Sequence, residues 1–363
     1  MTDTPAATIP PDIAALLVVG RHTEAVAVLR AAAALPGAPA AAWTLLARVL
    51  MAIGDPSDAF EAHREAIRRG DRSPETFMTA TVAARAAGRI DAALQVARAA
   101  LAGSRADWRL AHNLAVLLCE VRRLDEALAI LEGLVAGRTP EAVPDVVISL
   151  LSDVAGRLKD AGRLDDALAT YRRALAFRPD AAWLHSNLLL CLAYHPGTSP
   201  ADLLAEHQAF GARFSRPFDP LAFPNDPDPD RQMRVGFVSP DLRRHVVAVV
   251  VEDFLAALDP GRIEVFCYAN VAEPDDVTAR IRSTVPNWRS IHDVPDDEVE
   301  RLVRRDRIDV LIDLAGHTAR NRLLLFARKP APVQISWLGY PCTTGLPAID
   351  YVATHLPAEA VVE

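Results

Sequence analysis

The sequence predicts two domains of different class: an α-α superhelix of helical repeats, followed by an α/β domain built on a parallel sheet. Three observations predict this arrangement. A turn signal recurs at a fixed spacing through the first two hundred residues, a proline-rich segment follows it, and beyond that segment Val- and Ile-rich runs alternate with helical patterns. A chain of 363 residues has room for two or three domains.

The repeats are marked by one alanine in each turn signal. This alanine recurs in three steps of 34 residues and one of 40, at Ala25, Ala59, Ala93, Ala127 and Ala167. Leucine or alanine lies nine positions before and seven positions after each of them. Small residues at fixed places let two antiparallel helices approach closely. A helix–turn–helix unit of this period is typical of the tetratricopeptide repeat (TPR).

The longer fourth step places six extra residues near the turn at 137–140. We expect a sixth unit over residues 183–214, so that residues 1–215 form a TPR superhelix. The concave face of such a superhelix usually binds peptides or protein segments. The alternative is an array that serves only as a spacer or a dimerisation platform.

Residues 216–231 are rich in proline and predict a linker. After it, we expect strands at residues 233–238, 263–269, 308–314, 333–337 and 349–354, and helices at 247–258, 275–283 and 296–304. Strands that alternate with helices predict a parallel sheet covered on both faces. We therefore expect an α/β domain over residues 232–355 and a tail over residues 356–363.

Ligands of such sheets bind at the C-terminal ends of the strands. Three polar loops follow predicted strands there, at residues 239–245, 315–321 and 337–345. Each of them alone is compatible with an ordinary connection, in which Asp241 and Thr318 cap helices. Three such loops at one edge favour a binding site.

The composition excludes several classes of function. A net charge of −8 argues against nonspecific binding to nucleic acid, which depends on an excess of Lys and Arg. Four separate cysteines without a CxxC pair predict buried free thiols rather than disulfides or a zinc site. The longest apolar run, residues 246–251, is too short to span a bilayer, and no basic residue precedes Arg21 as a secretory signal requires. We therefore expect a cytoplasmic protein without membrane or nucleic-acid partners.

With these motifs and the repeats in front of them, the chain resembles the family 41 glycosyltransferases, the protein O-GlcNAc transferases of the bacterial TPR and SPINDLY-like type. The segments that carry the resemblance occur in the order of the family and extend over nearly the whole chain. They are residues 185–189, 194–196, 234–241, 313–318, 321–322, 328–334 and the run WLGYP at 337–341.

This resemblance implies a metal-independent, inverting transfer of GlcNAc from the nucleotide sugar UDP-GlcNAc to Ser or Thr hydroxyls, without a cofactor. It implies that the TPR concave face presents a protein acceptor. It also implies that residues 232–355 form the N-terminal Rossmann-like lobe of a GT-B glycosyltransferase. The family's catalytic positions correspond to His245 and His317, whose imidazoles can accept or orient a hydroxyl proton. Its substrate-binding positions correspond to Asp241, Thr318, Gly339, Tyr340, Pro341, Thr343 and Thr344.

The chain departs from the family in three places. Val246 follows the loop histidine where the family has small or polar residues, and Cys342 stands where the family has glycine. In the family a second lobe, which holds the diphosphate and most of the uridine, follows the strand at 349–354; we expect it to be missing from this chain. Three readings stay open: a truncated transferase whose activity is lost or completed by another chain, a TPR interaction scaffold with a vestigial lobe, and an enzyme that uses this half alone.

Overall fold

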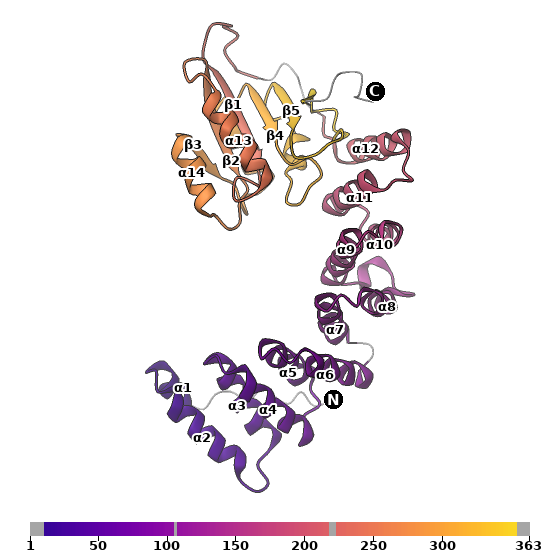
Figure 1. Cartoon of the computed structure of the whole chain (residues 1–363), viewed down its shortest axis with the longest axis vertical. Helices are drawn as coiled ribbons and strands as arrows, with labels where there is room; N and C mark the ends of the chain where they lie inside the picture. Colours follow the sequence, from indigo (N-terminus) through magenta and orange to yellow (C-terminus); the bar gives the residue numbers. More distant parts are fainter. Residues whose placement is uncertain (1–10, 105–106, 218–222, 354–363) are drawn as a thin grey trace. The chain divides into compact units, whose positions relative to one another are not determined.

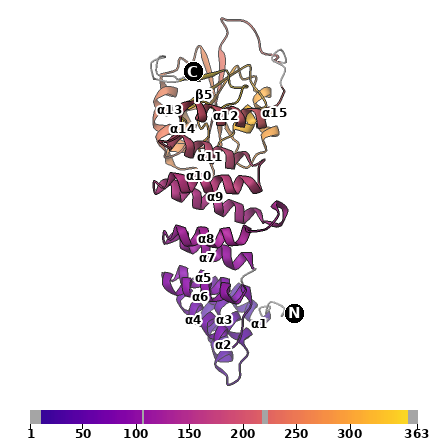
Figure 2. The same ribbon diagram turned by 90° about the vertical axis from the view of Figure 1, so that its right-hand side faces the viewer.

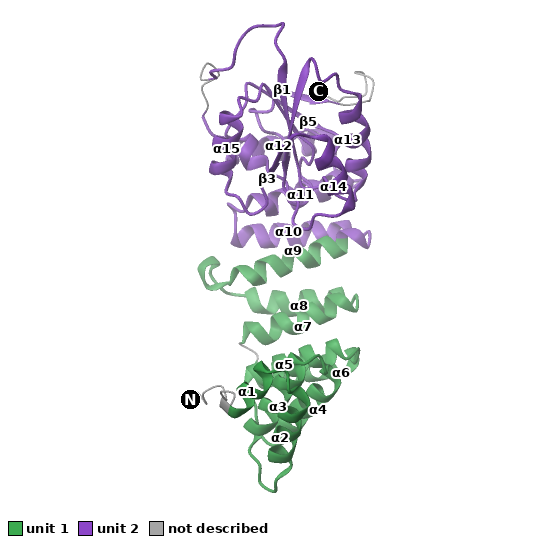
Figure 3. Cartoon of the chain, turned by 90° about the vertical axis from the view of Figure 1, so that its left-hand side faces the viewer, with its two compact units in different colours: residues 1–158 green, residues 159–363 purple. Residues whose placement is uncertain are grey.

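The computed structural model describes residues 11–104, 107–217 and 223–353. The tail that we expected at residues 356–363 lies outside this described part. The chain divides into two compact units, which we call the repeat unit (residues 1–158) and the mixed unit (residues 159–363) (Figures 1 and 3).

The described part of the repeat unit is helical. Its elements are α1 (Pro11–Val18), α2 (His22–Ala34), α3 (Ala40–Ala52), α4 (Pro56–Arg68), α5 (Pro74–Ala86), α6 (Ile90–Gly103), α7 (Trp108–Glu120), α8 (Leu124–Val135), the 3₁₀ helix η1 (Pro140–Ala142) and most of α9 (Asp145–Asp160). From α1 to α8, each helix packs on the next one along the chain (Figure 2). The marker alanines Ala25, Ala59, Ala93 and Ala127 are fully buried, which confirms the predicted repeat.

A residue in the left-handed region closes each turn between paired helices. Gly20, Gly54 and Gly88 have φ angles of 75°, 82° and 73° at this place, and Gly162 has 77°. Glycine adopts such angles without a steric penalty, which explains why the turn signal contains it. In the fourth turn the place is taken by Arg122, with φ of 60°.

The six-residue insertion lies between α8 and α9, as the spacing predicts. It is taken up by η1 and by a longer helix, since α9 has 16 residues whereas α7 has 13. Val147, Leu151 and Leu158 of α9 are all buried. The insertion therefore lengthens a connection and a helix while the apolar face stays packed.

The mixed unit begins with the helices α10 (Leu164–Phe177), α11 (Ala182–Tyr194) and α12 (Pro200–Phe214). Ala167 of α10 is fully buried, like the other marker alanines. The expected sixth helix pair is present as α11 and α12, but its second helix differs from the others. Ala201, the next marker position, is exposed, and α12 buries His207, Phe210 and Gly211 instead.

Within the described residues, one parallel sheet of six strands follows the helices, in the order β3-β2-β1-β4-β5-β6. Its strands are β1 (Met233–Ser239), β2 (Ile263–Ala269), β3 (Asn287–Ser290), β4 (Val310–Asp313), β5 (Val333–Trp337) and β6 (Tyr351–Ala353). This confirms the predicted α/β fold. The chain runs outward from β1 to β3 and returns to β4 beside β1. The point where the order reverses therefore lies between β1 and β4.

The helices of the α/β domain are α13 (Val246–Ala257), α14 (Asp276–Thr284), α15 (Asp296–Arg305) and the short α16 (Leu323–Phe326). A buried cluster that includes Phe237, Val247, Val251 and Ile281 joins β1 to α13 and α14. Neither β3 nor α16 was predicted from the sequence. The four residues of β3 form no apolar run, and the strand exists because it pairs with β2.

Among the described residues, no helix is long and apolar enough to cross a membrane. The same part of the chain contains no group of three or more His, Cys, Asp or Glu side chains that could hold a metal ion. All four cysteines are free: Cys119, Cys191 and Cys267 are buried, as predicted, and Cys342 is half-buried.

Candidate functional site

The three polar loops meet at one edge of the sheet because β1, β4 and β5 are parallel and adjacent. The loop after β1 starts with an ordered turn, in which the Asp241 backbone N–H donates to the Ser239 hydroxyl over 2.9 Å. The Asn270 backbone N–H, after β2, donates to the Ser239 carbonyl over 2.8 Å. The Asn270 side chain also donates to the carbonyl of Arg320, in the loop after β4. Asn270 therefore ties two of the three loops together.

His245 is the N-terminal capping residue of α13, at the end of the first loop. Its Nδ1 accepts a hydrogen bond of 3.3 Å from the Val247 backbone N–H. The side chain is 38% exposed, and its Nδ1 lies 3.9 Å from Oδ2 of Asp241. His245 is thus an accessible imidazole at the edge where this sheet type gathers its ligands.

Asp241 lies beside His245 and is mostly buried, with 13% of its side chain exposed. Burial raises the pKa of this carboxyl, and the nearby positive groups of His245, Arg243 and Arg320 act in the opposite direction. Nε of Arg243 is buried without a hydrogen-bond partner among the described residues. The edge between β1 and β4 therefore combines one carboxylate with two guanidinium groups and an imidazole.

The loop after β4 is held from within. Asp313 is buried, and its carboxylate accepts hydrogen bonds from the backbone N–H groups of Ala315 and Gly316 and from the Ser336 hydroxyl. Burial raises the pKa of Asp313 to about 6. Thr318, a predicted substrate-binding residue, donates its hydroxyl to the Ala315 carbonyl over 2.8 Å. The Thr318 hydroxyl therefore stabilises the turn within its own loop.

His317 is fully buried, and both of its ring nitrogens have partners. Nδ1 lies 3.0 Å from the Ser186 hydroxyl on α11, and Nε2 lies 3.0 Å from the Thr344 carbonyl. Burial lowers the pKa of His317 to about 3. In the described part of the chain neither nitrogen is free for a substrate, so the geometry favours a structural role, and the catalytic role stays a prediction.

The loop after β5 packs mainly against α12 instead of lining an open cleft. The hydroxyl of Tyr340, which is 5% exposed, lies 2.8 Å from Nε2 of His207. A Cβ on Gly345 would lie 1.8 Å from the His207 carbonyl oxygen, and a Cβ on Gly211 would lie 1.8 Å from the Gly345 carbonyl oxygen. Two glycines thus let the backbones of the helix and the loop touch.

The remaining predicted positions of this loop divide by exposure. Thr344 is buried, and a Cβ on Gly339 would lie 1.9 Å from the Leu314 carbonyl oxygen. Pro341 is exposed, and Thr343 is half-buried. Gly339, which is half-buried, Pro341 and Thr343 therefore have the surface that a direct contact with a sugar requires, and all of these roles stay predictions.

The residues of α12 that contact this loop were not predicted from the sequence. His207, Phe210 and Gly211 lie at spacings of three and four residues, which places them on one face of α12. Phe210 and His317 pack edge to face, with ring centroids 4.6 Å apart. This spacing was a usable signal, because it marks a buried face on a helix whose repeat-marker position is exposed.

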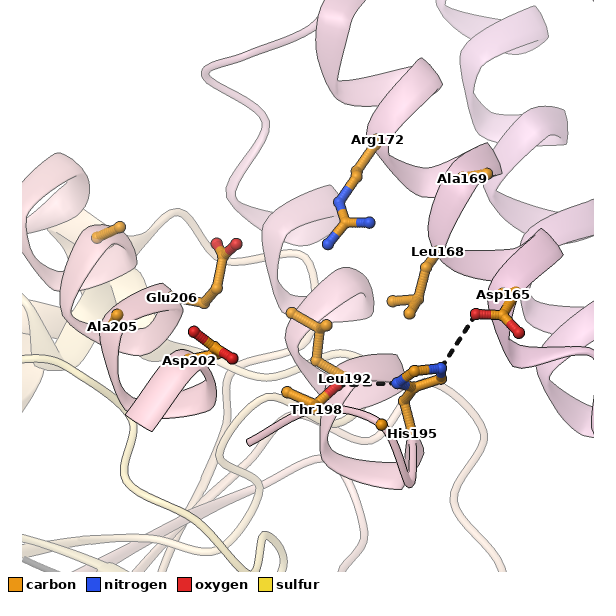
Figure 4. Close-up of a pocket in the computed structure, with 12 residues that line it drawn as sticks. Asp165, Leu168, Ala169, Arg172, Leu192, His195, Thr198, Asp202, Ala205 and Glu206 are labelled. Carbon is orange, nitrogen blue, oxygen red and sulfur yellow. Dashed lines mark hydrogen bonds and ion pairs between the residues drawn. The ribbon is translucent and has the colours of Figure 1, made fainter. Parts of the chain in front are cut away.

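A groove of about 670 Å³ lies on the helices of the mixed unit, away from the strand ends (Figure 4). Figure 4 shows His195 between Asp165 and Thr198; Nε2 lies 3.1 Å from the Asp165 carboxylate and Nδ1 lies 3.0 Å from the Thr198 hydroxyl. Arg172 and Glu206 also line the groove. Its position on α10 to α12 makes it a surface of the repeat array.

Comparison with known proteins agrees with this architecture. Residues 217–361 match the sequence model of Glycosyl transferase family 41, and residues 157–188 match that of the TPR repeat. A SPINDLY protein of Petunia hybrida, described as a probable UDP-N-acetylglucosamine–peptide N-acetylglucosaminyltransferase, is 38% identical over 190 residues. That match covers 51% of this chain and 20% of the relative.

A UDP-N-acetylglucosamine–peptide N-acetylglucosaminyltransferase of Caenorhabditis elegans is 31% identical over 126 residues, which cover 34% of this chain and 11% of that protein. The solved structure of a Thermobaculum terrenum O-GlcNAc transferase mutant superposes with a TM-score of 0.60 at 31% identity. It covers 77% of this chain and 52% of that one. The chain thus spans about a fifth of the length of the Petunia relative and about half of the solved transferase chain.

The fold, the loops at the C-terminal edge of the sheet and the comparisons together define the class of protein: a TPR array joined to a glycosyltransferase lobe. Residues 217–361 match the sequence model of Glycosyl transferase family 41, and the curated relatives that match are of the same SPINDLY and O-GlcNAc transferase type. This confirms the family that the sequence motifs indicated, and the sheet with its preceding helices matches the N-terminal half of an O-GlcNAc transferase.

Proposed function

We propose that this chain supplies the acceptor-side half of a protein O-GlcNAc transferase, which moves GlcNAc from UDP-GlcNAc to Ser or Thr hydroxyls of proteins. The observation that carries the proposal is His245, an accessible imidazole beside Asp241 at the point where the strand order of a family 41 lobe reverses. Such an imidazole can orient or deprotonate a hydroxyl near neutral pH. The names of the relatives, which are peptide N-acetylglucosaminyltransferases, support the same chemistry.

In this proposal the TPR array presents the acceptor protein on its concave face, and transfer needs neither a metal ion nor a cofactor. The groove on α10 to α12 supports a binding role for the array, because it offers carboxylates, a guanidinium and an imidazole along one surface. A cytoplasmic location belongs to the same proposal. Transfer that stops when EDTA is added would overturn the metal-independent part.

The test uses the chain alone and a fusion, made after Val352, to the part of the Thermobaculum terrenum enzyme that follows the matched segment. We expect the fusion to transfer GlcNAc to an acceptor protein. His245→Ala should lower the rate by about 10²-fold or more, the scale of a lost acid–base or orienting group. A folded fusion that binds acceptor protein but transfers no sugar would contradict the proposal and favour a TPR interaction scaffold.

A further inference from the structure

The two nitrogens of the His245 ring have different surroundings. Nδ1 accepts the hydrogen bond from the Val247 backbone N–H, which caps α13. None of the described residues makes a hydrogen bond to Nε2, and the side chain is 38% exposed. The ring therefore uses one nitrogen within the fold and offers the other to a ligand.

The partner of Nδ1 determines where the proton of the neutral ring lies. A backbone N–H can only donate, so Nδ1 must present its lone pair to Val247, over 3.3 Å. Asp241 could instead accept a proton from Nδ1, but its Oδ2 is 3.9 Å away, beyond hydrogen-bond distance. In the neutral imidazole the remaining nitrogen, Nε2, then carries the proton.

The position on α13 supports this tautomer. The first turn of a helix has backbone N–H groups without intrahelical partners and a partial positive charge, both of which favour an acceptor over a donor. The first turn of α13 has no acidic residue of its own. The local field and the capping bond thus act in the same direction.

This arrangement is the reverse of a Ser-His-Asp triad. There, a carboxylate accepts a hydrogen bond from Nδ1–H, which leaves Nε2 unprotonated as the base. Here, Nδ1 accepts a hydrogen bond from the Val247 backbone N–H of α13, which leaves Nε2–H as a free donor. We propose that His245 acts through Nε2–H as a hydrogen-bond donor that orients an oxygen atom of the substrate, and that it does not remove the proton of the acceptor hydroxyl.

This inference rests on the proposed function for its substrate, but its structural part is tested on the chain alone. The chain is labelled with ¹⁵N-histidine, and its imidazole signals are recorded at about pH 8, above the ordinary histidine pKa of about 6.5. The signals of His245 are assigned by their loss in His245→Gln. We expect a protonated Nε2 and an unprotonated Nδ1. A ring protonated at Nδ1 would overturn the inference.

The rate of sugar transfer by the fusion distinguishes a hydrogen-bond donor from a base at His245. The amide nitrogen of glutamine can stand in for Nε2–H as a donor, but an amide cannot take up a proton. We expect His245→Gln to stay within about tenfold of the unchanged fusion, the scale of one altered hydrogen bond. His245→Ala should lose about 10²-fold or more. A loss in His245→Gln as large as that in His245→Ala would make His245 the base.

His245→Asn is the matched control for folding. Its short side chain carbonyl caps helices well, but it does not reach the position of Nε2. We expect this variant to keep the stability of the parent chain and to lose transfer like His245→Ala. If the unchanged fusion transfers no sugar, the proposed function fails, whereas the ¹⁵N measurement still decides the tautomer.

Discussion

Nε2 of His207 accepts a hydrogen bond of 2.8 Å from the hydroxyl of Tyr340. The direction follows from the other nitrogen of the same ring. Nδ1 lies 2.7 Å from the Leu203 carbonyl oxygen, which can only accept, so Nδ1 carries the proton. Both side chains are buried. The bond therefore joins α12, the last helix of the repeat array, to the loop after β5 in the transferase lobe.

Removing the donor of this bond should destabilise the chain. Tyr340→Phe leaves Nε2 of His207 buried without a partner, which costs about 1–3 kcal/mol. Urea unfolding of the full chain, followed by circular dichroism, measures the change in the free energy of unfolding. Tyr351→Phe is the control, because Tyr351 is 64% exposed and its change should stay below about 0.5 kcal/mol. Equal effects of the two variants would contradict the role of the bond.

Two glycines within helices should respond to alanine with opposite changes in stability, because only one of them lies at the contact between α12 and the loop after β5. Gly211→Ala places a Cβ 1.8 Å from the Gly345 carbonyl oxygen, so helix and loop must separate. We expect a loss of about 3 kcal/mol or more, at the upper end of overpacking effects. In α8, a Cβ on Gly133 meets nothing within 4 Å, so Gly133→Ala should stabilise by up to about 1 kcal/mol. Thermal and urea unfolding of both variants measure these changes.

The left-handed turn at Arg122 predicts a stabilising substitution in the repeat unit. A non-glycine residue with φ of 60° costs about 1 kcal/mol, and glycine does not bear this cost. Arg122→Gly should therefore raise the free energy of unfolding by about 1 kcal/mol. Gly88→Ala, at the equivalent turn, should lower it by a similar amount, since Gly88 has φ of 73°. A destabilised Arg122→Gly chain would show that the arginine side chain outweighs the strain.

Two buried histidines predict acid sensitivity of the contact between α11–α12 and the lobe. Burial is the largest cause that lowers the pKa of His207 and of His317, the latter to about 3. When the pKa of a histidine is lower in the folded state than in the unfolded state, the folded chain has its full stability above the unfolded pKa of about 6.5. Below that pH the unfolded state binds the proton first, so the free energy of unfolding falls. His317 alone should lose about 2 kcal/mol between about pH 6.5 and pH 5.

Asp313 acts in the opposite direction over part of this range. Burial raises its pKa to about 6, so its contribution to stability increases as pH falls through that value. The measurement is therefore a difference: urea unfolding against pH for the parent chain and for His317→Gln, which cannot titrate. We expect the variant to lose less stability on acidification, and the exposed His22→Gln to follow the parent. Parallel curves for the parent and His317→Gln would refute the assignment.

Much of the fold follows from local pattern. The repeat period identifies buried alanines because the same helix pairing recurs at each step. The Val- and Ile-rich runs identify β1, β2, β4 and β5 because these strands are mostly apolar and partly or fully buried, whereas β6 is exposed. Strand pairing identifies what the sequence pattern does not: the residues of β3, which form no apolar run, are a strand because they pair with β2. The register of β4 beside β1 likewise required the three-dimensional structure.

The candidate site was predicted in part. The rule that ligands gather at strand ends selected three loops that the structure brings to one edge of the sheet, where Asp241 and His245 lie side by side. It could not separate loop residues that face solvent from those that face α12, because the partner of His317 and Tyr340 lies more than a hundred residues away in sequence. The sequence also contained no sign that the helix would hold Nδ1 of His245.

The role that we propose for this lobe, with His245 at its edge, is protein O-GlcNAc transfer. The most direct measurement is the intact mass of an acceptor protein after incubation with UDP-GlcNAc and the fusion, in parallel with the His245→Ala fusion. We expect added N-acetylhexosamine with the first and about 10²-fold slower addition with the second, at equal folded content by circular dichroism. An active fusion that transfers equally fast after His245→Ala would contradict it.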